Sequence, residues 1–177
     1  MLITQTEIIL STPTEGIITL PVQPGQHWPE QGGFYAGILR ADTGKLFHII
    51  VPGVEADLGE FEYGGYGERE GIAQSSWDGV ANTRELCASP IDHPAAQAVA
   101  ALTLNGHSDW HLGSRREYSL CAANVPHLFA DREWYWASTE YAPNPSYAWI
   151  QRLSDGTQST SNKHDSYLVR PLRRIKI

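Results

Sequence analysis

The chain has 177 residues, a formal net charge of -7 and two cysteines. This length suits one domain with a real core, and the acidic balance disfavours nonspecific nucleic-acid binding, which needs an excess of Lys and Arg. No apolar run approaches the roughly 18 residues of a membrane span, and the start of the chain lacks the basic and apolar regions of a signal peptide. We therefore expect a soluble protein made in the cytoplasm, with Cys87 and Cys121 as buried free thiols rather than a disulfide framework.

Residues 1–24 are predicted to form a β-hairpin arm. The segments ITQTEIIL and GIITLPV alternate apolar and polar residues, and the turn-forming sequence STPTEG separates them. A hairpin of two strands is marginal alone, so this arm should pair with the main body or with another chain, which is one route to an oligomer. Residues 25–177 then form the main domain.

A second hairpin is predicted over residues 34–51, because Asp42 and Gly44 suit the tight reversal between its strands. The following segment, residues 55–79, is rich in Gly, Tyr and acidic residues. Three aromatic residues of this segment could face a ligand, namely Tyr63, Tyr66 and Trp77. We favour a long loop in which these side chains fold back onto the core. Its carboxylates lack the regular spacing of a calcium loop and are interpreted as solvated.

Two helices are predicted in the middle of the chain. The first lies in residues 89–106, with Asp92 as its cap, Pro94 in its first turn and Asn105-Gly106 at its end. The second spans residues 115–124 and begins with the capping box of Ser114 and Glu117. Upstream of both, residues 78–86 start at an Asp-Gly turn and are interpreted as an extended segment.

Strands with many aromatic residues dominate the C-terminal part. WYWASTEY at 134–141 places Trp134 and Trp136 on one face and Tyr135 and Ala137 on the other, and YAWIQRL at 147–153 alternates in the same way. Residues 157–166 are interpreted as a polar loop. The last segment is a strand, in which Pro171 indicates an edge position or a bulge. Helices followed by such strands predict an α+β domain.

Four motifs in order, GHSDWHLGSRREYSL, YWASTEY, YAWIQRLSDGTQ and YLVRPLRRI, resemble the C-terminal domain family of collagen-like bacterial adhesins. Upstream, GGFYAGI, DGVANT and HPAAQAV are similar to phage-encoded members of that family. The resemblance implies a C-type lectin-like fold over residues 25–177, with two helices packed on twisted antiparallel β-sheets and long loops. It also implies that the tryptophans fill the core and that Arg170 makes a buried polar link. Gly113 and Tyr118 depart from the pattern, which has Pro and Leu at these places.

The resemblance implies a non-enzymatic binding protein, a phage tail fibre or tail-associated protein that recognises a glycan or protein on the host surface. Expected partners are that host ligand, other virion proteins and further copies of the chain, with a trimer as one option. The expected location is the virion, or alternatively the bacterial cytoplasm. Candidate ligand-binding residues on the predicted loops are Tyr141, Asn144, Tyr147, Asn162 and His164. The Glu-Pro-Asn and Trp-Asn-Asp motifs of calcium-dependent lectins are absent, so neither a metal nor another cofactor is expected.

Two alternatives remain open at this point. The first is a structural tail or baseplate protein without a receptor site of its own. The second is an enzyme, but formylglycine-generating enzymes of similar fold need two redox cysteines late in the chain, whereas Cys87 and Cys121 both precede YWASTEY. His107 and His111 have a metal-binding spacing but no obvious third ligand. No catalytic residue is therefore predicted.

Overall fold

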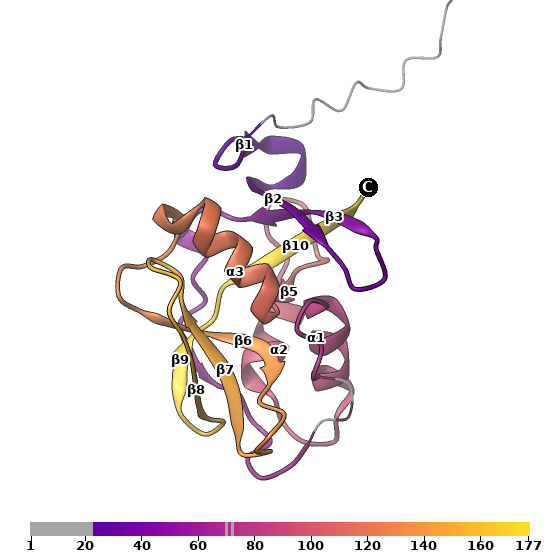
Figure 1. The fold of residues 1–177 in the computed structure, drawn as a ribbon, viewed down its shortest axis with the longest axis vertical. Coiled ribbons are helices and arrows are strands. Elements are labelled where there is room, and N and C mark those ends of the chain that lie inside the picture. Colours follow the sequence, from indigo (N-terminus) through magenta and orange to yellow (C-terminus); the bar gives the residue numbers. More distant parts are fainter. Residues whose placement is uncertain (1–22, 70, 72) are drawn as a thin grey trace, which may run out of the picture.

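A computed structural model describes residues 23–69, 71 and 73–177 of the chain (Figure 1). The predicted N-terminal hairpin arm lies outside these residues, apart from its last two positions. The described part is an α+β structure with three α-helices and two five-stranded sheets, which confirms the predicted class. None of its helices is long and apolar enough to cross a membrane.

The first sheet is antiparallel and brings together the two ends of the described chain. Its strands, in spatial order, are β1 (His27–Trp28), β2 (Gly33–Arg40), β3 (Leu46–Val51), β10 (Pro171–Lys176) and β5 (His111–Leu112). Strands β2 and β3 form the predicted hairpin, with a register shift between Tyr35 and Gly37 that the positive φ of Gly37, 125°, accommodates. Pro171 was expected at an edge or bulge, but β10 lies inside the sheet. Proline is tolerated there because it is the first residue of the strand.

The second sheet carries most of the aromatic strand residues. In spatial order its strands are β4 (Glu60–Glu62), β9 (Ser166–Leu168), β6 (Trp134–Glu140), β7 (Tyr147–Arg152) and β8 (Gln158–Asn162). Strand β8 corrects the interpretation of residues 157–166 as a loop. Its polar residues pair in register with β7, because pairing with a neighbouring strand outweighs weak local propensity.

The helices differ from the sequence prediction in number and length. Helix α1 (Gly79–Ala88) replaces the extended segment expected there, because Asp78 is a helix cap whose side chain accepts a hydrogen bond from the Ala81 N–H (2.9 Å). Helix α2 (Pro94–Ala100) is capped by His93 instead of Asp92 and ends five residues early. The Asn105-Gly106 pair instead makes a turn that brings Leu104 back to His107. Helix α3 (Arg115–Asn124) and its capping box are as predicted.

Strand β6 is the centre of the core, because both of its faces are buried. Tyr135 and Ala137 pack with the first sheet and α3, whereas Trp136 packs with α1, α2 and β5. The predicted alternation of these side chains is thereby confirmed. Trp110 and Trp136 are buried, while Trp134 and Trp149 are partly buried against the core. The tryptophans therefore fill the interior as expected.

Arg170 links the two sheets where the chain passes from β9 to β10. Its side chain is fully buried and donates to Asp57 Oδ1 (2.9 Å) and to the carbonyl of Leu128 (3.2 Å). It also donates to the carbonyls of three consecutive residues that follow β3, namely Pro52, Gly53 and Val54. The expected buried polar link at Arg170 is present.

Candidate functional site

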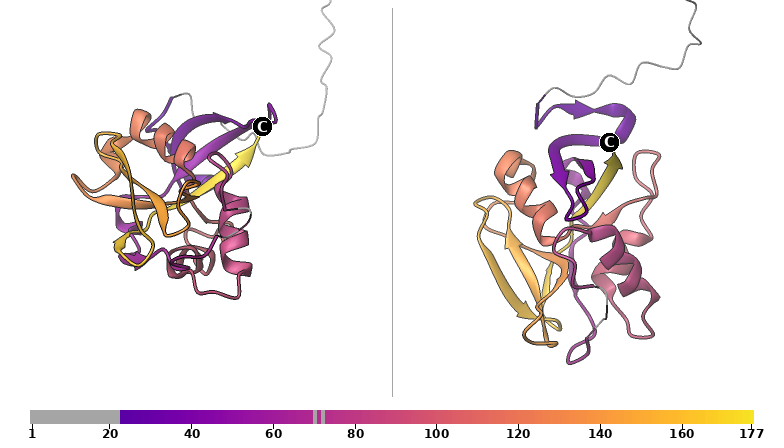
Figure 2. Two further views of the ribbon diagram at one scale, coloured as in Figure 1. Left: turned by 60° about the horizontal axis from the view of Figure 1, so that its bottom comes forward. Right: turned by 45° about the vertical axis from the view of Figure 1, so that its right-hand side comes forward.

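The five predicted site residues gather at one end of the second sheet. Three of them belong to the β6–β7 connection and its flanks, and two to the end of β8 and the turn that follows it; they are Tyr141, Asn144, Tyr147, Asn162 and His164. Figures 1 and 2 show these loops at the end of the molecule that lies away from the C-terminus and β1. The structure thus brings together residues that the sequence placed on two separate segments.

The β6–β7 connection is held by its own hydrogen bonds. The N–H of Tyr141 donates to the carbonyl of Tyr147 (3.0 Å), and the N–H groups of Asn144 and Tyr147 close two further turns. The side-chain oxygen of Asn144 accepts from the N–H of Ser146 (3.0 Å), which shapes the loop tip. The Tyr141 ring packs edge-on against Trp149, with centroids 5.6 Å apart. The Tyr141 ring and the Asn144 side chain are therefore held in place by contacts within the protein.

The second group of predicted residues lies beside a loop that was not assigned to the site. Asn162 is the cross-strand partner of Tyr147. His164 is exposed, and its ring meets that of Tyr66 with centroids 4.7 Å apart. Of the three aromatic residues singled out in the Gly-rich segment, Tyr63 and Trp77 fold back onto the core as favoured, whereas Tyr66 is 56% exposed. Alternation gives no signal in a glycine-rich loop, so the sequence could not separate Tyr66 from its neighbours.

Lys163 bonds to these loops from the interior of the protein. Its side chain is 0% exposed, forms an ion pair with the buried carboxylate of Glu140, and donates to the carbonyls of Gly65 (3.3 Å) and Glu68 (2.6 Å). Its backbone N–H donates to Ser146 in the β6–β7 connection (2.9 Å). Sequence reasoning missed this residue because a lysine in a polar segment is normally a solvated side chain.

The residues considered for metal binding take up separate positions. His111 Nε2 lies 3.0 Å from Glu117 Oε1 in the interior, whereas His107 Nε2 lies 3.1 Å from the carbonyl of Glu30. Within the described ranges, no group of three or more His, Cys, Asp or Glu side chains is placed to hold a metal ion. Cys87 and Cys121 are both free, as expected, but only Cys121 is buried, whereas Cys87 is partly exposed. Burial raises the pKa of each thiol, so neither is an activated nucleophile.

A cavity of about 520 Å³ lies between α1 and the segment that leads into β5, away from the loops described above. Its walls combine Val80, Ala88 and Trp110 with the polar residues Ser108 and Asp109. The Asp109 carboxylate is held by Arg173 (2.5 and 3.0 Å). The cavity shares none of its lining residues with the loop cluster.

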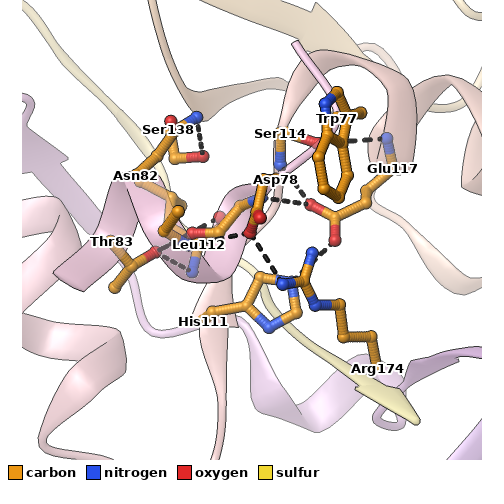
Figure 3. A network of polar contacts seen from close by, with 12 residues as sticks. Trp77, Asp78, Asn82, Thr83, His111, Leu112, Ser114, Glu117, Ser138 and Arg174 are labelled. Atoms are coloured by element: carbon orange, nitrogen blue, oxygen red, sulfur yellow. Dashed lines mark hydrogen bonds and ion pairs between the residues drawn. The ribbon is translucent and has the colours of Figure 1, made fainter. Parts of the chain in front are cut away.

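Beneath this cavity lies a buried polar network that joins three elements (Figure 3). Glu117 Oε2 accepts from the N–H groups of Ser114 (2.7 Å) and Gly79 (3.1 Å), and Oε1 lies against His111. Burial alone would raise the pKa of Glu117, but the charge and hydrogen bond of His111 and the bonds from Ser114 lower it below the ordinary value. Because its partners are helix starts and a strand, this network supports the fold.

Comparison with known families gives one match. The model of the Lcl C-terminal domain, a family of collagen-like adhesin C-terminal domains, matches residues 71–173, which is more than half of the chain. The chain belongs to the Lcl C-terminal domain family. Membership indicates an adhesin-like binding protein. No curated protein matches the chain.

The Lcl C-terminal domain match covers the β6–β7 connection and the β8–β9 turn, but it begins after Tyr66. Its range also contains the two departures from the pattern noted above, and these touch each other. A Cβ atom at Gly113 would lie 2.6 Å from the Tyr118 ring and 2.7 Å from Leu172. The larger side chain at position 118 therefore occupies the space that a side chain at position 113 would need. The Tyr118 hydroxyl also donates to the carbonyl of Arg170 (2.6 Å).

Proposed function

We propose that the protein is a non-enzymatic receptor-binding component of a phage tail, a tail fibre or tail-associated protein that attaches to a glycan or protein on the host surface. One observation carries the proposal: aromatic and amide side chains gather on hydrogen-bonded loops at the end of the molecule away from the C-terminus and β1 (Figure 1). Such an arrangement leaves one end for attachment to a particle and the other for recognition.

Three further features support the proposal. The family consists of adhesin domains, and the upstream segments are similar to phage-encoded members. Two sheets flanked by helices, with recognition residues on connecting loops, suit a C-type lectin-like fold over residues 25–177. In this view residues 1–24 provide the contact to other virion proteins or to further copies of the chain, with a trimer as one option.

The test is a binding assay of the purified protein on a glycan array and on a panel of intact bacterial cells. Simultaneous alanine substitution of Tyr141, Asn144 and Tyr147 should abolish binding and leave the thermal unfolding temperature close to that of the wild type. Alanine at Lys45, Leu46 and Lys176 provides the control, because these exposed residues lie in the strands β3 and β10 of the first sheet or directly before β3. Unchanged binding by the Tyr141 triple variant would refute the site, and no binding by the wild type would favour a structural virion protein.

The same assay tests the role of metal ions. Because the calcium-dependent sugar motifs are absent from the sequence, binding should be the same with Ca²⁺ and with a chelator. Loss of binding on chelation would show that recognition depends on a bound cation.

A further inference from the structure

The loop cluster consists of the β6–β7 connection and the β8–β9 turn, and residues 63–69 form a third loop beside them. This third loop follows β4, which pairs with β9 so that Glu62 lies opposite Ser166, beside the β8–β9 turn. The N–H of Gly64 donates to the carbonyl of Lys163 (3.0 Å), which joins the two loops directly. At the surface the rings of Tyr66 and His164 meet at an interplanar angle of 67°, and both side chains are more than half exposed. An exposed aromatic pair on joined loops is a platform for the apolar face of a ligand.

Lys163 gives this platform a fixed position relative to the predicted residues. Its ammonium group donates to the carbonyls of Gly65 and Glu68, its N–H donates to Ser146, and its charge is matched by Glu140 at the end of β6. Lys163 therefore bonds through its side chain to the 63–69 loop and to the end of β6, and through its backbone to the β6–β7 connection. Loops ordered in advance lose less conformational entropy when a ligand binds.

The charge around the platform selects the class of ligand. Lys163 presents no charge to the outside, because it is fully buried and paired. Among the described residues of β4, of the 63–69 loop and of the β8–β9 turn, the acids outnumber the single exposed base, Arg69; they are Glu60, Glu62, Glu68 and Asp165. Such a surface repels polyanions and contains no clamp for a sulfate or carboxylate.

We propose that this end of the molecule binds an uncharged sugar, with the apolar face of a pyranose ring on the Tyr66–His164 pair, and that Lys163 is the positioning residue for the 63–69 loop. The inference rests on the proposed role of the loop cluster in host recognition. It adds the ligand class and two residues, Tyr66 and Lys163, that lie outside the predicted set.

The experiment is an affinity measurement on neutral oligosaccharides and on sulfated or uronate-containing ones, by array and then by titration of the best neutral binder. Tyr66→Ala should weaken binding at least tenfold, whereas Tyr66→Phe keeps the ring and should stay within about twofold of the wild type. Binding should favour neutral sugars and change little with salt. Preference for sulfated or uronate sugars, with affinity that falls as salt rises, would overturn the ligand class.

The role of Lys163 is tested in the double variant Lys163→Met/Glu140→Gln, which removes both charges together so that neither is left alone in the interior. We expect affinity to fall about as far as in Tyr66→Ala, amide hydrogen exchange to rise in residues 63–69, and the unfolding temperature to change little. Unchanged affinity in this variant would refute the positioning role.

These outcomes separate the inference from the proposed function. If the wild type binds sugars or cells and the Tyr141, Asn144 and Tyr147 variant does not, host recognition by the cluster stands, and retained binding by Tyr66→Ala then refutes the inference alone. If the wild type binds no sugar and no cell, both fail.

Discussion

Two buried ionic centres have the same construction but different surroundings. In the Glu117 centre, the carboxylate of Glu117 joins His111 and the N–H groups that begin α1 and α3. In the Lys163 centre, the ammonium group of Lys163 joins Glu140 and two loop carbonyls. Each charge serves several segments, because a buried charge needs several partners to offset the loss of water. The first centre holds helices and a strand together, whereas the second holds loops at the surface. The contrast indicates that one centre supports the fold and the other the binding surface.

The largest effect is expected for Glu117→Gln. This substitution removes the charge and turns one acceptor of the buried group into a donor that faces other donors, so the free energy of unfolding should fall by about 3–5 kcal/mol. Denaturant unfolding followed by tryptophan fluorescence measures the change. Glu85→Gln is the matched control, because the partner of Glu85 is the exposed Arg84; its cost should stay below about 1 kcal/mol. A decrease of similar size in the unfolding free energy of both variants would show that the Glu117 centre has no special role in the fold.

Acid should weaken the Glu117 centre. The pKa of Glu117 in the folded protein lies below the ordinary value of 4.5. The contribution of this carboxylate to the free energy of unfolding is therefore complete above the unfolded pKa and is lost as pH falls toward the folded pKa. The difference in unfolding free energy between wild type and Glu117→Gln should be constant near pH 6 and should shrink below about pH 4.5, by at most about 1.4 kcal/mol per pH unit. Unfolding curves between pH 3 and pH 7 measure this difference. A difference that grew in acid would contradict the assigned direction.

The sequence predicted the Glu117 centre in part and the Lys163 centre not at all. The capping box of Ser114 and Glu117 is local, so spacing alone identified both residues and the start of α3. The bonds of Glu117 to Gly79 and His111 depend on tertiary packing, and the helix at Gly79 was itself missed because an Asp-Gly pair reads equally well as a turn and as a helix start. Local patterns therefore predicted the capping box of this centre but not the bonds of Glu117 to Gly79 and His111.

Lys163 and Glu140 illustrate the opposite case. Nothing in their local sequences distinguishes them from solvated residues, and their meeting depends on the register between β6, β7 and β8. The predicted site residues came together because each flanks a strand of the same sheet. Tyr66 joined them through the pairing of β4 with β9, which connects two distant segments and leaves no periodic signal in the sequence.

A smaller effect is expected where the two departures from the family pattern meet. Gly113→Ala places a methyl group against the Tyr118 ring and Leu172, and overpacking of this kind costs about 1–3 kcal/mol. In Gly113→Ala/Tyr118→Leu the smaller side chain makes room, so the double variant should lose less stability than the sum of the single variants, by about 0.5–3 kcal/mol. A double-mutant cycle in denaturant measures this coupling. Strict additivity would mean that the two departures are independent.

The smallest effect on global stability is expected when the whole Lys163 centre is replaced. Lys163→Met alone removes the cation that is paired with the buried Glu140 carboxylate and should cost more than the double variant does. Lys163→Met/Glu140→Gln removes both charges, and replacement of a buried ion pair by uncharged groups is often close to neutral, so this variant should lie within about 1 kcal/mol of the wild type. Denaturant unfolding compares the three proteins, and hydrogen exchange shows where the double variant loosens. Because the Lys163 centre joins loops, the exchange should rise in residues 63–69 and not in α1 or α3. A double variant as unstable as Glu117→Gln would show that both centres hold the fold and would remove the distinction between them.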